Sequence, residues 1–139
     1  MRKFGFAGST GRRRIALTAA FAFVAGGLPG VALAIEGQYS VEGQNPGQER
    51  AYKGEAQIKR TGRTYSVIWR VGQVPQFGTG ILIDKTFSIV FQTFTQAGGP
   101  GRPGIAVFSV ENDRVSQGIW TGIGQQDTGI ESWTATDRP

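Results

Sequence analysis

The residue types that could perform chemistry in this chain are few, and most of them are carboxylates. The 139-residue sequence contains no histidine, which removes the commonest general base and the commonest neutral metal ligand. A serine nucleophile would need a lysine as its base, but Lys53 and Lys59 occupy alternating polar positions typical of a solvent-facing strand. We therefore expect no catalytic residues and a protein that is not an enzyme.

Paired carboxylates can act on glycosides, so the acidic residues were considered one by one. Most fall at predicted turns, where Asp is a common turn former: Asp84, Glu111, Asp113 and Asp127. Glu131 differs, because Gly129 and Trp133 lie two residues to either side and share its face of a strand. The favoured interpretation is an outward charge on the last strand. The alternative is an inward ionisable group beside a ligand cavity, and an enzymatic role would fall on Glu131 or Asp127.

Metal and phosphate sites are weakly supported. Asn112, Asp113, Asp127 and Glu131 offer oxygen ligands, but they do not form a twelve-residue calcium loop. The glycines of positions 98–101 are not followed by the Lys-Ser/Thr pair of a phosphate-binding loop. We expect neither a metal nor a cofactor.

The aromatic residues are the best indication of function. Six of them are candidate ligand-binding residues on one predicted inner face: Tyr39, Tyr52, Tyr65, Trp69, Phe108 and Trp120. An apolar pocket with a few polar groups from Tyr and Trp is typical of a small-molecule site. The favoured alternative is that these rings simply fill a glycine-rich core.

The predicted elements are all strands. Period-two alternation recurs, with turn residues every eight to twelve positions. Eight strands are predicted: Glu36–Gly43, Arg50–Arg60, Arg63–Gly72, Phe77–Asp84, Thr86–Phe94, Gly104–Glu111, Arg114–Thr121 and Thr128–Ala135. Asn112-Asp113 is expected to form a two-residue hairpin turn. Residues 137–139 are expected to form a frayed tail.

Short connections and a face that mixes glycine with bulky rings predict a closed eight-stranded antiparallel up-and-down barrel. A two-sheet sandwich is the alternative. An outer-membrane barrel was also considered, but the face formed by Lys53, Glu55, Gln57 and Lys59 would then have to avoid lipid.

The longest predicted loop, Thr95–Pro103, interrupts the series of tight turns. It could cover one barrel mouth or contact a protein partner through Gly98, Gly99 and Arg102. An ordinary mobile connection is the alternative.

The first thirty-four residues have the three parts of a secretory signal peptide. A basic head with five Lys/Arg precedes an apolar run at positions 15–24, and Ala32-Leu33-Ala34 is an A-x-A cleavage signal. We expect residues 1–34 to be removed and residues 35–139 to form a single periplasmic or secreted domain.

The charge of the chain is balanced once the leader is removed. Five of the fifteen Lys/Arg lie in the leader, so ten remain against ten Asp/Glu. This balance argues against a nucleic-acid partner. We also expect no stable membrane insertion after cleavage.

The chain resembles a group of small exported bacterial proteins, mostly uncharacterised and some labelled fibronectin-binding-like. The resemblance rests on short glycine and aromatic motifs: Gly37-x-Tyr39-x-Val41, Tyr52-x-Gly54, Tyr65-x-Val67-x-Trp69, Gly104–Phe108 and Gly118-x-Trp120. It implies an exported β-barrel-like domain and assigns no catalytic residue. In architecture alone the expected barrel is similar to lipocalins and avidins, without a diagnostic motif of either. The sequence thus predicts a binding protein for a small apolar molecule. The alternative is a protein-interaction module that contacts another exported or extracellular protein, either as an adhesin-like binder or as an inhibitor of an exported hydrolase.

Overall fold

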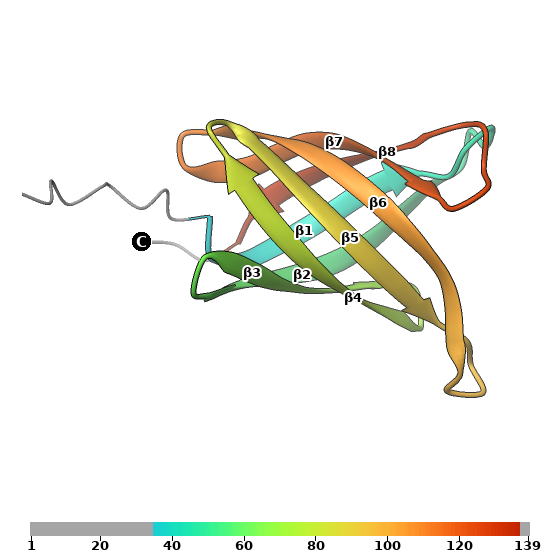
Figure 1. Cartoon of the computed structure of the whole chain (residues 1–139). Helices are drawn as coiled ribbons and strands as arrows, with labels where there is room; N and C mark the ends of the chain where they lie inside the picture. The colour runs from blue at the N-terminus through green and yellow to red at the C-terminus, as the bar shows by residue number, and fades with distance from the viewer. Residues whose placement is uncertain (1–34, 137–139) are drawn as a thin grey trace, which may run out of the picture. The chain divides into compact units, whose positions relative to one another are not determined.

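The computed structural model describes residues 35–136, and all of its regular elements are strands. There are eight strands, and they close into one barrel, whose arrangement is seen in Figure 1. Their bounds are β1 Gly37–Gln44, β2 Ala51–Thr61, β3 Thr64–Val71, β4 Val74–Ile83, β5 Thr86–Phe94, β6 Pro100–Glu111, β7 Arg114–Gly122 and β8 Gly129–Ala135. The predicted strands overlap these closely, so the all-β prediction is confirmed. The predicted signal peptide and the predicted frayed tail lie outside the described residues.

Every strand pairs antiparallel with its neighbours in sequence, and β1 also pairs with β8. The sheet is therefore closed in the order β1 to β8, which confirms the up-and-down barrel and excludes the two-sheet sandwich. Closure leaves no free sheet edge among these strands. Two register shifts interrupt β6, one opposite Gln92–Phe94 and one between Phe108 and Val110.

The two ends of the barrel differ in their connections. One end, called the closed end, has the tight hairpins β2–β3, β4–β5 and β6–β7. The β6–β7 turn is the predicted two-residue hairpin, because Glu111 pairs with Arg114 and both Asn112 and Asp113 have positive φ (49° and 58°). The opposite end, called the mouth, has the connections at 45–50, 72–73, 95–99 and 123–128.

The prediction of a long loop at Thr95–Pro103 is wrong in its second half. Strand β6 begins at Pro100, so the connection shortens to residues 95–99. Thr95 and Gly99 close this turn, since the amide of Thr95 donates to the carbonyl of Gly99 at 2.8 Å. Proline is tolerated in β6 because it lies at the start of the strand and near a register shift.

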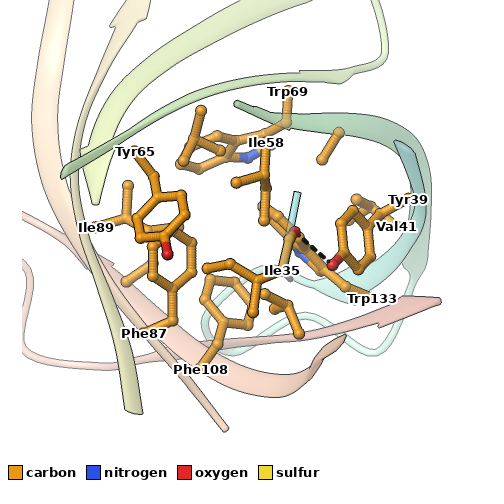
Figure 2. Packing of buried hydrophobic residues seen from close by; sticks show 14 of the residues in the cluster. Ile35, Tyr39, Val41, Ile58, Tyr65, Trp69, Phe87, Ile89, Phe108 and Trp133 are labelled. Carbon is orange, nitrogen blue, oxygen red and sulfur yellow. Dashed lines mark hydrogen bonds between the residues drawn. The ribbon is translucent and has the colours of Figure 1, made fainter. Parts of the chain in front are cut away.

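Rings from most of the strands fill the interior towards the closed end. Trp133 lies at the centre, with ring centroids 4.7 Å from Phe108, 5.7 Å from Tyr39 and 5.8 Å from Trp69. The side chain of Ile35 is fully buried, and its carbonyl accepts a 2.7 Å hydrogen bond from the Tyr39 hydroxyl (Figure 2). The predicted pairing of rings with glycines is also present, since a side chain on Gly80, Gly104 or Gly118 would meet Phe87, Phe91 or Phe108. Each large side chain buried here contributes about 1.5–3 kcal/mol to folding.

The outer surface has two chemically different sides. Strands β1–β3 carry the charges, and the register places Glu42 opposite Lys53 and Glu55 opposite Arg70. All four side chains are exposed. Strands β4–β8 instead carry an apolar belt, which we define as the exposed outward side chains Phe77, Ile81, Val90, Ile105, Val107, Ile119 and Ile130.

The belt is continuous across neighbouring strands. Val90 is paired with Ile105, and Ile119 is paired with both Val107 and Ile130. Serine, threonine and glutamine fill the positions between them, and positions 103–110 and 115–126 contain no charged residue. This side of the barrel therefore differs from the charged face formed by β1–β3.

Candidate functional site

The interior is not filled at the mouth. A cavity of about 100 Å³ lies there, and its lining combines aromatic rings with a few polar groups. Its lining residues are Asn45, Tyr52, Trp69, Val71, Gln76, Phe91, Thr93, Trp120 and Glu131. A larger groove of about 530 Å³ lies over β6–β8, lined partly by Val107, Ile119 and Ile130 of the belt. Of these two, the mouth cavity is the one that brings together an ionisable group and several rings, so we treat it as the candidate site.

Glu131 points into the barrel, and the favoured prediction of an outward charge is wrong. Only 5% of its surface is exposed. The burial pattern of β8 alternates strictly, with Gly129, Glu131 and Trp133 on the inner face. The sequence contained this signal, because Glu131 shares the two-residue spacing of an inward glycine and an inward tryptophan. Glutamate is rarely fully buried unless its carboxyl group has partners.

Three neutral side chains connect to Glu131 by hydrogen bonds. The Tyr52 hydroxyl donates to Oε1 of Glu131 at 2.7 Å, and the Trp133 indole donates to Oε2 at 2.7 Å. The Trp120 indole donates in turn to the Tyr52 hydroxyl at 3.0 Å. In the part of the chain that the structure describes, no buried side-chain nitrogen or oxygen lacks a partner. Each member of the network therefore has at least one partner, which suits the network to hold its members in fixed positions.

Two glycines make this meeting possible. Gly43 on β1 is in register with Tyr52 on β2 and with Glu131 on β8. A Cβ at Gly43 would lie 2.6 Å from the Tyr52 hydroxyl oxygen and 2.7 Å from Cγ of Glu131, which is too close. Gly129 likewise leaves space for Trp120, since a Cβ at position 129 would lie too close to the indole ring. Four side chains from three strands, β2, β7 and β8, thus meet across two positions that have no side chain.

Burial changes the ionisation of both acidic groups. The pKa of Glu131 is raised above its ordinary value, chiefly by loss of solvation, while the hydrogen bonds from Tyr52 and Trp133 act in the opposite direction. The pKa of Tyr52 is also raised, first by burial and then by the nearby carboxylate of Glu131. Tyr52 therefore keeps its proton and remains a donor. Perturbed groups that line a cavity are typical of functional sites.

The six ring residues predicted from sequence fall into two groups. Tyr52, Trp69 and Trp120 line the mouth cavity. Tyr39, Tyr65 and Phe108 instead pack in the filled core. The three residues proposed to contact a partner also lie in two different elements. Gly98 and Gly99 are in the β5–β6 turn, and Arg102 is exposed on β6. Sequence reasoning missed Phe91, Gln76 and Thr93 as lining residues.

Comparison of the chain with protein-family models, with curated proteins and with solved structures finds no match. Within residues 35–136, no helix is long and apolar enough to cross a membrane. No group of three or more His, Cys, Asp or Glu that could hold a metal ion occurs in the same range. Function must therefore be argued from the cavity and the surface.

Proposed function

We propose that the chain is an exported, non-enzymatic binding protein whose ligand site is the cavity at the barrel mouth. One observation carries this proposal: a cluster of buried apolar side chains fills the core, yet the mouth leaves about 100 Å³ beside a buried, hydrogen-bonded carboxyl group. Ligand sites commonly combine apolar walls with a few placed polar groups. Export, and with it a periplasmic or secreted location, rests on the signal-peptide pattern of residues 1–34.

The composition supports binding rather than catalysis. Glu131 is the only carboxyl group that lines the cavity, so a second acid or base for glycoside hydrolysis is not provided by its lining. The balance of ten basic and ten acidic residues after position 34 disfavours a nucleic-acid partner. The charged outer positions of β1–β3 are consistent with a barrel that is not inserted in a membrane.

Tryptophan fluorescence tests this proposal directly. The chain has three tryptophans, and two of them, Trp69 and Trp120, line the cavity. We expect a saturable fluorescence change with at least one member of a panel of small cationic, neutral polar and aromatic compounds. A blocking variant, Thr93→Phe, should abolish that change, whereas Thr79→Phe on the outer face should not. A saturable change that persists in Thr93→Phe would place the ligand elsewhere and contradict the proposal.

A second candidate function, protein interaction, is favoured by the apolar belt. An uncharged apolar surface is complemented best by another such surface. Within residues 35–136, the surface of this chemistry is the belt itself. We therefore assign the belt to contact with a second copy of the chain, in a two-fold arrangement. Because residues 35–139 have no net charge, two copies would meet without overall electrostatic repulsion.

Sedimentation velocity over a range of concentrations tests the belt. We expect a reversible dimer for the unmodified protein, and a monomer for Ile119→Lys, which places a charge in the middle of the belt. Gln57→Lys on the charged side is the matched control and should leave the dimer intact. A monomer at every concentration would contradict self-association, and a complex with a different protein that Ile119→Lys abolishes would reassign the belt.

A further inference from the structure

Within residues 35–136, no positively charged side chain is bonded to the carboxyl group of Glu131. Its two hydrogen-bond donors, Tyr52 and Trp133, are neutral. Neither lysine nor arginine lines the mouth cavity. A buried charge is stable only when an opposite charge or a metal compensates it. A carboxylate accepts about four hydrogen bonds, so the two seen here leave acceptor capacity for a ligand.

The walls around this carboxyl group are aromatic on several sides. The rings of Trp69 and Phe91 lie 5.2 Å apart at an interplanar angle of 64°, and those of Phe91 and Trp120 lie 6.4 Å apart at 73°. Rings at such steep angles present both edges and faces around the space that they enclose. Tyr52 adds a fourth ring. Aromatic faces attract cations, and a cage of rings is a common way to hold methylated ammonium groups.

We propose that the mouth cavity binds a small organic ammonium ion, held by the carboxylate of Glu131 and by the rings of Tyr52, Trp69 and Trp120. This inference rests on the proposed function and names the class of ligand for the same site. The cation would supply the charge that the lining lacks, and the rings would contact its methyl or methylene groups.

The size of the cavity limits the ligand. Its volume is about 100 Å³, and one water molecule takes about 30 Å³ in the liquid. The space therefore suits a head group with a few methyls rather than a long chain. Asn45, Gln76 and Thr93 add neutral polar groups to the lining, and these could hydrogen-bond a hydroxyl or amine substituent on the ligand.

Other ligand classes fit the cavity less well. An anion would be repelled by Glu131. A calcium ion needs about six to eight oxygen ligands, and the lining holds a single carboxylate. A purely apolar molecule would use the rings but would leave the ionised carboxylate without compensation.

The protonation behaviour expected of Glu131 is consistent with a positively charged ligand. Its pKa is raised by burial, so a bound cation should favour the ionised form and release a proton. The group that faces it from β2 is Tyr52, whose raised pKa keeps it protonated. Trp69 on β3, Phe91 on β5 and Trp120 on β7 are neutral.

Calorimetry with a charged and an uncharged ligand of the same shape tests the inference. The probes are choline and its neutral analogue, in which carbon replaces the nitrogen, added to the unmodified protein above the pKa of Glu131. We expect choline to bind at least about tenfold more tightly, with proton release seen as a dependence of the heat on the buffer. Glu131→Gln should remove this preference. Glu42→Gln, on the outer face of β1 next to Gly43, should keep it.

Equal binding of the two probes would overturn the inference and leave the proposed function standing. Binding of neither, together with no response to the wider panel of small compounds, would overturn both. If Glu131→Gln fails to fold, the comparison of the two probes on the unmodified protein decides alone.

Discussion

The hydroxyl of Tyr52 and the carboxylate of Glu131 are 79 residues apart in sequence, yet they are joined by a 2.7 Å hydrogen bond. Their strands, β2 and β8, do not pair with each other; both pair with β1, and Gly43 lies between the two residues in the register. The closure of the barrel by β1 and β8 thus creates the candidate site. Without closure, the carboxyl group would have no such partner.

Tyr52→Phe should weaken the protein, because it removes the donor to Glu131 and the acceptor for the Trp120 indole. The loss of a hydrogen bond to a buried, charged group predicts a decrease of about 1–3 kcal/mol in the free energy of unfolding. Urea denaturation measures it. Tyr65→Phe is the matched control, since no hydrogen bond of the Tyr65 hydroxyl is seen among the described residues, and it should change stability much less. Equal effects of the two variants would show that the network adds nothing.

Gly43→Ala tests whether the missing side chain at this position is required. The added methyl group would collide with Tyr52 and Glu131, and overpacking of this kind costs about 1–3 kcal/mol. Thermal unfolding followed by circular dichroism measures the loss. In Gly99→Ala the new methyl group would have its nearest neighbour 3.6 Å away, and we expect a change within about 0.5 kcal/mol. A Gly43→Ala protein as stable as the unmodified one would show that the strands adjust freely.

Glu131 shows how much of this site can be predicted from the sequence. Strand number, order and inner face followed from period-two alternation, because each strand obeys it locally. Glu131 also had the inward period, but a single sequence does not show that Tyr52 and Trp133 would satisfy its carboxylate. Those partners depend on the closure of the barrel, which is a long-range event. Partial filling of the interior could not be predicted either, since the volume left at the mouth depends on how all the rings pack.

The apolar belt was missed for a different reason. The second predicted strand, with Lys53, Glu55 and Lys59 outward, is the clearest alternating segment, but its polar outer face does not continue around the barrel. In β7, Ile119 is an outward apolar residue between Gly118 and Trp120. Strands with apolar residues on both faces indicate contact on both sides, and this signal was present in the sequence.

The pH dependence of stability should report the buried state of Glu131. Its folded-state pKa is raised above the ordinary value of 4.5, so the folded protein holds this proton more tightly than the unfolded chain does. The stabilisation is therefore complete below the unfolded-state pKa and is lost as the pH rises through the folded-state pKa. Chemical denaturation across this range should show the decrease. Glu131→Gln should lack it, and an identical pH profile in the two proteins would contradict a buried carboxyl group.

Ile35→Ala should open the closed end of the barrel. The Ile35 side chain is fully buried, and truncation of a buried isoleucine costs about 2–5 kcal/mol. Ile83, which is 67% exposed, provides the control, because Ile83→Ala should stay within about 0.5 kcal/mol. The denaturant midpoints of both variants measure these two losses of stability. If Ile35→Ala proves as mild as Ile83→Ala, Ile35 does not seal the core.

The most direct test of the ligand site is an NMR titration that follows the three tryptophan indole groups, assigned by single Trp→Phe substitutions. The account predicts slow solvent exchange of the Trp120 and Trp133 indole protons, because both are hydrogen-bonded inside the barrel. It also predicts that addition of choline shifts the Trp69 and Trp120 signals in a saturable way. Rapidly exchanging indole protons, or indole signals that no ligand of the panel moves, would contradict the claim that the barrel mouth is a binding site.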